Sequence, residues 1–322
     1  MRIAITGIKG QLGTELQQAL GGEHQVLGLD LPEQDVTDLR IIDHVAELEP
    51  SLVIHAAAMT DVDGCARNPE AAYSVNALGT RNVALGCQRA EAEMLYVSTN
   101  EVFDGTKDSP YWEFDEPNPI NAYGSSKLAG ERYVQFLLSR FYIVRTSWLF
   151  GKGGNNFVKK VLSLADREGR LRVVTDEMAS PTYALDLALA IKKLIEQRIY
   201  GIYHFTNAGA CSRFDFAESI LELAGRKGVS LVPISSEEFV RNSQPPRQSC
   251  LHNFCGQALG ISLRPWPGFL YLASLCRASY ISKVICSLSS CPRATEVFHG
   301  LFCPLAWDER GVFVCARSPA RG

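Results

Sequence analysis

Residues 2–20, RIAITGIKGQLGTELQQAL, decide the fold of this chain. The stretch opens with a short apolar run at 2–6, and TELQQAL at 14–20 has the composition of a helix. A strand followed by a glycine-rich turn and a helix is typical of the first unit of a dinucleotide-binding sheet. The GxxGxxG spacing alone is a weak pattern, but its place directly after a first strand makes the prediction specific.

Three glycines in this turn have different predicted tasks. Gly7 permits a tight turn, Gly10 lets the backbone approach a pyrophosphate, and Gly13 lets the helix pack on the strand. The start of the helix, with Gln11 and Leu12, then faces the phosphates, because the N-terminus of a helix attracts anions.

The second strand and the loop after it complete the predicted cofactor site. The strand HQVLGLD ends in Asp30, which lies 20 residues after Gly10. An acid at this place binds the adenosine ribose hydroxyls and repels a 2′-phosphate, although a solvated turn aspartate would look the same in the sequence. Asp35 and Val36 follow in the segment DVTD, whose acids suit the N-terminus of the next helix.

A third strand, SLVIHAAA at 51–58, ends in Ala56, Ala57 and Ala58, and such small side chains let a flat cofactor lie against the backbone. Strand-like and helical segments alternate along the chain, which predicts an α/β fold with a doubly wound parallel sheet of the Rossmann type. We expect further helices at 39–50, 71–90, 121–131, 158–169, 184–197 and 212–225, and further strands at 94–97, 141–151, 171–177 and 201–207.

The stretch 94–131 predicts the chemistry. A buried strand leads to Thr99, and the later NAYGSSKLAGE predicts a helix that carries Tyr123 and Lys127. Two residues four apart share one face of a helix, and an ammonium beside a phenol lowers the pKa of the phenol. Thr99 could hydrogen-bond a carbonyl oxygen held before the tyrosine, so this site could move a proton to or from a C–O group. Tyrosine and lysine four apart also occur by chance on solvated helices.

The composition fits an ordinary globular protein and argues against several classes of function. Apolar residues make up 46% and charged residues 21%, and the net charge of −3 offers no attraction for nucleic acid or an anionic membrane surface. No apolar run approaches the roughly 20 residues that span a bilayer, and the chain opens on a strand, so we expect no signal peptide, no membrane partner and a cytoplasmic location. The ten cysteines lack the paired CxxC spacing of zinc sites, and we predict no metal.

Seven motifs occur in the order in which extended short-chain dehydrogenases/reductases carry them. They are TGIKGQLG, HAAAMTDVD, VSTNEVFDG, YGSSK, RTSWLFG, NNF and SPTYALDLA. The segments STNEVFDG, RTSW and SPTYA are more specific than a tyrosine and a lysine four apart. Over residues 1–266 the chain therefore resembles, within that group, the dTDP-4-dehydrorhamnose reductase family.

The resemblance implies an activity and a set of site residues. The activity is hydride transfer from NADPH or NADH to C4 of a dTDP-linked 4-keto-6-deoxy sugar, dTDP-4-dehydro-L-rhamnose, which becomes dTDP-L-rhamnose. Tyr123 would protonate the forming alkoxide, Lys127 would tune Tyr123 and hold the nicotinamide ribose, and Thr99 would bind the oxygen. The resemblance also allows a homodimer. The positions that would face the sugar nucleotide are Thr99, Glu101, Trp148, Asn156, Ser180 and Thr182.

Three positions depart from the pattern of that family. Glu101 stands where an aromatic residue is common, Glu177 where glutamine is usual, and Arg213 where an aromatic residue is common. The first of these leaves the identity of the sugar open, and Asp30 only tilts the choice between NADH and NADPH. Some relatives bind magnesium, to which Glu15 could contribute, but an acidic surface residue is more often solvated.

The resemblance divides the chain into three regions. Residues 1–150 mainly form the NAD(P)-binding domain with the three catalytic positions, and residues 151–266 mainly form an interleaved sugar-nucleotide-binding region. Residues 267–322 show no sustained period and contain five cysteines, which favours a frameshifted or poorly ordered tail over a genuine extension.

Two other functions stay open from the sequence. A sugar-nucleotide epimerase, or a reductase of a different keto-sugar, would share the fold and the catalytic positions. An epimerase would keep its NAD through purification, whereas a reductase consumes NAD(P)H. A non-catalytic regulatory subunit would keep the fold but would need none of Thr99, Tyr123 and Lys127.

Overall fold

The computed structural model describes residues 1–267, 306–307 and 313–314, in two compact units, Met1–Ser274 and Leu275–Gly322. The described part of the second unit is one antiparallel pair, β13 (Ala306–Trp307) with β14 (Phe313–Val314). The prediction about 267–322 otherwise lies outside the described residues. All that follows concerns the first unit.

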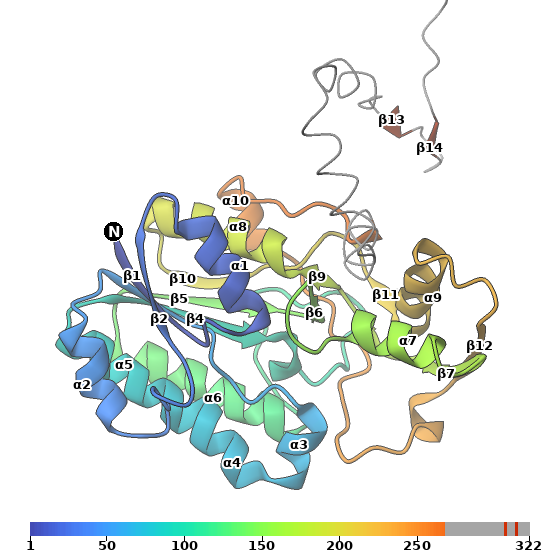
Figure 1. The fold of residues 1–322 in the computed structure, drawn as a ribbon, viewed down its shortest axis with the longest axis horizontal. Helices are drawn as coiled ribbons and strands as arrows, with labels where there is room; N and C mark the ends of the chain where they lie inside the picture. The colour runs from blue at the N-terminus through green and yellow to red at the C-terminus, as the bar shows by residue number, and fades with distance from the viewer. Residues whose placement is uncertain (268–305, 308–312, 315–322) are drawn as a thin grey trace, which may run out of the picture. The chain divides into compact units, whose positions relative to one another are not determined.

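A six-stranded parallel sheet forms the centre of this unit (Figure 1), as the alternating strands and helices predicted. Its order is β2, β1, β3, β4, β5, β10, so the strand order reverses between β1 and β3. In doubly wound sheets such a reversal opens a crevice at the carboxyl ends of the strands, where ligands bind. The strands are β1 (Arg2–Thr6), β2 (Gln25–Leu29), β3 (Leu52–His55), β4 (Glu93–Thr99), β5 (Phe141–Thr146) and β10 (Gly201–His204).

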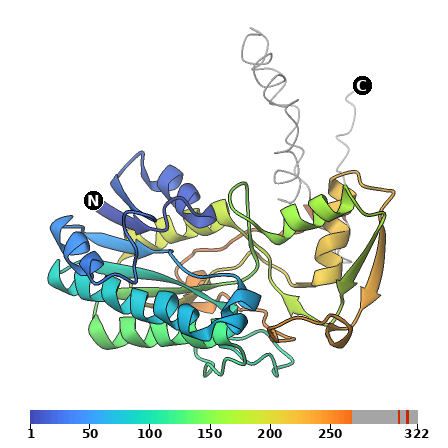
Figure 2. The same cartoon turned by 60° about the horizontal axis from the view of Figure 1, so that its bottom comes forward.

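Two layers of helices cover the sheet, as the turned view in Figure 2 shows. The helices α1 and α8 pack on one face, and α2, α5 and α6 pack on the other. Alternation along β1 explains the division, because Ile3 and Ile5 join the core under α1 and α8 whereas Ala4 joins the core under α2 and α5. These helices are α1 (Gln11–Leu20), α2 (Arg40–Glu47), α5 (Thr80–Arg89), α6 (Ala122–Leu137) and α8 (Ala184–Gln197).

A smaller region with its own apolar core lies beyond the carboxyl edge of the sheet (Figure 1). It is built on α7 (Phe157–Ala165), α9 (Arg213–Leu223) and the parallel pair β7 (Arg170–Val174) and β12 (Ser230–Ile234). The two regions are interleaved along the chain, because after α7 and β7 the chain returns to the central sheet to form α8 and β10. Short elements complete the unit: α3 (Val62–Arg67), η2 (Asn100–Val102), β6 (Leu149–Phe150), β8 (Met178–Ala179), β9 (Thr182–Tyr183), β11 (Cys211–Ser212), η3 (Ser236–Glu238) and α10 (Phe254–Ala258).

The single helix expected at 71–90 is interrupted. The chain forms α4 (Pro69–Tyr73), a π-helical turn η1 (Ser74–Gly79) and then α5. Asn76 fixes this wider turn, because its amide bonds both the N–H and the carbonyl of Met59, and its own carbonyl accepts the hydroxyl of Thr80. The amide of Asn76 also donates to Ser126 on α6, so the π turn ties the loop after β3 to the helix that carries Tyr123.

The single strand expected at 141–151 is also divided. β5 ends at Thr146, and β6 begins at Leu149 in a different sheet, where it pairs with β9. Between them Trp148 adopts the left-handed conformation, with φ of 41°. A bulky residue in this conformation stores strain that its surroundings must offset, and such residues concentrate at ligand sites.

Within the residues that the structure describes, none of the helices has the length and apolarity needed to cross a bilayer.

Two buried histidines make the fold sensitive to acid. Burial, helped by the nearby charges of Lys127 and Arg145, lowers the pKa of His55 and of His204 to about 3. An unfolded imidazole titrates near about 6.5, so below that pH the unfolded chain binds more protons and stability falls until the pH approaches about 3.

We therefore expect the free energy of unfolding to drop by about 4 kcal/mol between pH 7.5 and pH 5, which is about 2 kcal/mol for each histidine. Urea titrations at several pH values measure this slope. The variant His55→Gln should lose close to half of it, and an unchanged slope in the variant would contradict the assignment of the acid sensitivity to His55.

Candidate functional site

The glycine turn after β1 closes tightly against the end of β3. Gly7 has φ of +71°, and a Cβ there would lie 2.8 Å from the backbone nitrogen of Ala57. A Cβ on Gly13 would lie 2.2 Å from the carbonyl oxygen of Gly7. Gly13 therefore packs on the turn, whereas the sequence had predicted that it packs on the strand. The predicted cofactor positions in this turn and at Ala56 and Ala57 thus lie together where the strand order reverses.

The start of α1 is open to a ligand. The helix begins at Gln11, and its N-cap, Gly10, contributes no side-chain hydrogen bond to the first turn. Uncapped N–H groups at a helix start are a phosphate site when glycine lets the backbone approach. The side chain of Leu12 belongs to the main core, so only its backbone can serve a cofactor. Glu15, which we expected on the surface, is buried.

The predicted ribose acid, Asp30, has its carboxylate already engaged. It accepts the backbone N–H groups of Lys9 at 2.7 Å and of Leu31 at 2.8 Å, and it therefore fixes the glycine turn to the end of β2. Asp35 accepts the N–H and the hydroxyl of Thr37, whereas the side chain of Val36 is buried. Ribose binding by this edge stays a prediction.

The N-terminus of α6 is fixed to the end of β4. Asn121 caps the helix by accepting the N–H of Gly124 at 2.8 Å, and it donates to Glu101 at 2.7 Å. A Cβ on Gly124 would lie 2.0 Å from the carbonyl oxygen of Glu101, so only glycine allows this approach. The hydroxyl of Thr99 in turn accepts the N–H of Glu101 at 3.2 Å. Tyr123, in the first turn of α6, is thereby brought to Thr99.

The prediction that Lys127 lowers the pKa of Tyr123 was wrong. Burial and the charge of Glu101 raise this pKa well above its usual value, and the hydrogen bond from Thr99 only partly opposes them. Lys127 is directed elsewhere, because its Nζ donates to the carbonyl of Val97 at 2.7 Å. The phenol therefore stays protonated at neutral pH, which suits a proton donor.

The buried Lys127 connects the catalytic helix to the glycine turn. Its ammonium lies 4.2 Å from the ring centroid of Tyr96, which stacks on His55 at 5.6 Å. The Nδ1 of His55 lies 2.6 Å from the hydroxyl of Thr6, the last residue before Gly7. Burial lowers the pKa of Lys127 to about 7, although the charge of Glu131 raises it. Two of the three predicted catalytic residues, Thr99 and Tyr123, thus meet directly, and the third lies behind them.

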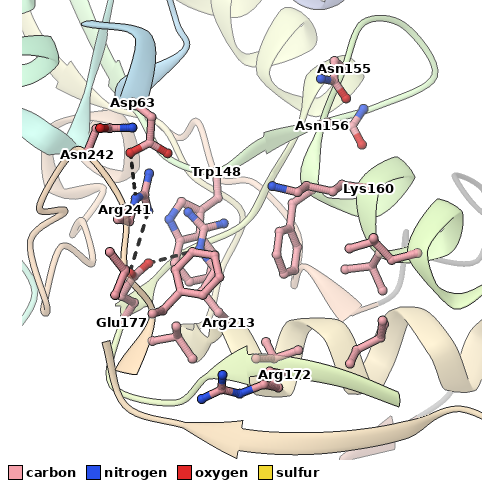
Figure 3. Close-up of a pocket in the computed structure, with 18 of the residues that line it drawn as sticks. Asp63, Trp148, Asn155, Asn156, Lys160, Arg172, Glu177, Arg213, Arg241 and Asn242 are labelled. Atoms are coloured by element: carbon pink, nitrogen blue, oxygen red, sulfur yellow. Dashed lines mark hydrogen bonds and ion pairs between the residues drawn. The ribbon is translucent and has the colours of Figure 1, made fainter. Parts of the chain in front are cut away.

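A cavity of about 590 Å³ opens beside the smaller region (Figure 3). This volume is within the range of sites for small ligands. One wall is apolar and comes from α7 and β7, and the rest is polar and charged. Its charged lining residues are Lys160, Arg172, Arg213, Arg241, Asp63 and Glu177.

Of the predicted substrate positions, Trp148 and Asn156 line this cavity. The side-chain amide of Asn156 is already hydrogen-bonded within the protein, because it donates to Gln11 and Gly151 and its oxygen caps α7. It therefore joins the predicted cofactor turn to the loop before α7. Ser180 and Thr182 are buried and are not among the residues that line this cavity, so their contact with the sugar nucleotide stays a prediction. Thr182 pairs with β6 and donates its N–H to the carbonyl of Trp148.

A charge network beside Trp148 was not predicted as a unit. The guanidinium of Arg213 lies 3.6 Å from the ring centroid of Trp148 and pairs with Glu177 at 3.5 Å. Arg241 pairs with Asp63 at 3.1 Å and approaches Glu177 at 3.9 Å. Figure 3 shows these side chains converging on one end of the cavity.

Glu101 lies in the field of the same network. Burial raises its pKa, while Asn121, Arg213 and Arg241 lower it. The three departures noted in the sequence, Glu101, Glu177 and Arg213, therefore act on one another. The opposite signs of Glu177 and Arg213 were the available signal for this pairing.

Comparisons with known proteins agree on one family. Residues 1–272 match the family model described as RmlD substrate binding domain. The chain is 39% identical over 280 residues to a dTDP-4-dehydrorhamnose reductase of Aggregatibacter actinomycetemcomitans, which covers 82% of this chain and 95% of the relative. It is 36% identical over 267 residues to the spore coat polysaccharide biosynthesis protein SpsK of Bacillus subtilis, covering 82% of this chain and 94% of that protein.

A solved structure has the same fold. It is the dTDP-4-dehydrorhamnose reductase of Bacillus anthracis in complex with NADP, with a TM-score of 0.81 and 41% sequence identity. The match covers 84% of this chain and 96% of that one.

Proposed function

This chain belongs to the RmlD substrate binding domain family of dTDP-4-dehydrorhamnose reductases, and we infer that it reduces the C4 keto group of dTDP-4-dehydro-L-rhamnose with NADPH or NADH. The product is dTDP-L-rhamnose. The inference is carried by the match over residues 1–272, which contains the Thr99–Tyr123 pair.

The turn after β1 fits a nicotinamide dinucleotide. A Cβ on Gly7 or on Gly13 would collide with neighbouring backbone, so these glycines allow the tight turn, and the N-terminus of α1 offers uncapped N–H groups for the pyrophosphate. When bound, the cofactor supplies the hydride that reduces C4. The residues proposed to hold it are Gly7, Gly10, Gln11, Leu12, Gly13, Asp30, Asp35, Val36, Ala56, Ala57, Ala58, Tyr123 and Lys127.

Tyr123 is proposed to give its hydroxyl proton to the substrate oxygen. A keto group that gains a hydride at carbon becomes an alkoxide, which is a far stronger base than phenolate, so the transfer is downhill even from a phenol whose pKa is raised. The hydroxyl of Thr99, which hydrogen-bonds the phenol, is proposed to orient both the phenol oxygen and the substrate oxygen.

Lys127 is proposed to hold the nicotinamide ribose. It lies one helical turn after Tyr123, where its ammonium donates to the carbonyl of Val97 and burial lowers its pKa to about 7. Contact with the nicotinamide ribose would require Lys127 to release the carbonyl of Val97.

The assay of the purified full chain tests the activity. We expect stoichiometric oxidation of NADPH or NADH when dTDP-4-dehydro-L-rhamnose is added, with formation of dTDP-L-rhamnose. Tightly bound oxidised NAD with no net consumption would instead support an epimerase. No turnover at all would support the regulatory subunit or a different keto-sugar. The homodimer stays a prediction, which sedimentation analysis would test.

A further inference from the structure

Two of the four basic residues in the cavity are already neutralised. Arg241 is paired with Asp63 and lies near Glu177, and Arg172 is paired with Glu238 at 3.4 Å. The guanidinium and carboxylate charges of these residues therefore balance within the protein.

The other two basic residues keep donors for a ligand. Lys160 is exposed in the cavity wall, and within the described part of the chain its ammonium has no hydrogen-bond or ion-pair partner. Arg213 meets Glu177 only through Nε, at the long distance of 3.5 Å, so its two terminal nitrogens keep their hydrogens. Figure 3 shows Lys160 reaching from α7 toward Arg213 and Trp148.

Arg213 is held rigidly for this task. Its guanidinium lies against Trp148 and 5.0 Å from the ring centroid of Phe157, and its backbone N–H donates to the backbone carbonyl of Glu177 at 3.2 Å. Burial lowers the pKa of Arg213, whereas the charges of Glu177 and Glu101 raise it. The indole ring of Trp148, whose backbone is held in the left-handed conformation, provides the flat face on which the guanidinium rests.

We propose that Lys160 and Arg213 bind the diphosphate of the nucleotide sugar, which places the two remaining parts of that ligand at opposite ends of the cavity. This inference rests on the proposed function. Arg213 rests on Trp148, two residues after Thr146, and Thr146 pairs with Thr99 on the neighbouring strand, so the sugar belongs on this side. On the side of Lys160 the wall is apolar and suits the base, through Val161, Leu164 and Leu171.

A diphosphate fits this pair better than a single carboxylate does. The two cations come from different helices, α7 and α9, so they can contact different phosphoryl groups of one ligand. A planar guanidinium can make two parallel bonds to one phosphate, and an ammonium serves as a point charge for the other. The carboxylate of Glu177 weakens the attraction between Arg213 and a phosphate. The affinity for the diphosphate therefore depends on both Lys160 and Arg213 rather than on either alone.

Binding of dTDP and of thymidine to the full chain, measured by calorimetry, separates the diphosphate from the base. For Lys160→Gln and for Arg213→Gln we expect dTDP affinity to fall by about 10-fold to 100-fold, with thymidine affinity unchanged. Lys159→Gln is the matched control, because that neighbouring ammonium donates to the carbonyl of Gly154 and does not line the cavity. Its dTDP affinity should match that of the wild type.

Unchanged dTDP binding in Lys160→Gln, or an equal loss in Lys159→Gln, would overturn the proposal. Arg213→Lys keeps the charge and should recover part of the dTDP affinity if the loss in Arg213→Gln is electrostatic; a loss as large as that of Arg213→Gln would place the effect on Trp148 instead. These results do not depend on turnover. A wild type that binds dTDP as described but fails to reduce the keto-sugar would overturn the proposed function and leave the diphosphate site in place.

Discussion

Tyr123→Phe is expected to lower kcat for the keto-sugar by a factor of about 10²–10⁴, with affinity for NADPH and for dTDP within about twofold of the wild type. The substitution removes one hydroxyl, and that hydroxyl is the proposed proton donor. Thr99, its hydrogen-bond partner in the structure, can still bind the substrate oxygen but leaves it unprotonated. Initial rates at saturating cofactor, with binding measured separately, distinguish a lost proton donor from a lost site.

A second tyrosine on the same helix provides the control. Tyr133 is in α6, ten residues after Tyr123, and it does not line the cavity. Tyr133→Phe should therefore turn over at the rate of the wild type. If Tyr123→Phe kept more than about a tenth of the activity, the proton donor would be another group, and if biological activity were untouched the regulatory-subunit hypothesis would gain.

The sequence predicted the parts of the fold that depend on local pattern. Apolar runs and the glycine turn after Thr6 located the strands of the sheet, and α8 has the bounds expected from its sequence. What it missed depends on contacts between distant segments. The π turn at Asn76 depends on Met59 and Ser126, which lie on other segments, and no periodicity within 71–90 reveals it.

The candidate site divides in the same way. Spacing alone placed Tyr123 and Lys127 on one helix. The structure adds that the carbonyl of Val97 accepts a hydrogen bond from the Lys127 ammonium and that the charge of Glu101 raises the pKa of the Tyr123 phenol. The direction of the Tyr123 pKa shift is set by that environment, so no spacing rule could give it. Likewise Glu177 and Arg213 are 36 residues apart, and only the pairing of β8 with β11 brings them together.

The largest loss of stability is expected from Glu131→Gln. Glu131 and Arg145 are almost fully buried and form two hydrogen bonds, at 2.9 and 2.7 Å, between α6 and β5. The hydroxyl of Ser98 on β4 donates to the same carboxylate at 2.5 Å, and Phe103 lies 5.2 Å from the guanidinium. Removing the carboxylate leaves the Arg145 cation buried without its counter-charge, which should cost about 3–5 kcal/mol in the free energy of unfolding.

Urea unfolding of three further variants decides whether burial is the reason. Arg67→Gln breaks a pair with Asp61 that is more than half exposed, and it should cost less than about 1 kcal/mol. The double variant Glu131→Gln with Arg145→Met removes both charges, so it should be more stable than Glu131→Gln alone, because the uncompensated cation is gone. Arg145→Met alone should be as damaging as Glu131→Gln, since it leaves the opposite charge buried. Strictly additive losses in the double variant would mean that water reaches the pair, and that the strands beneath the catalytic helix are held by packing rather than by this ion pair.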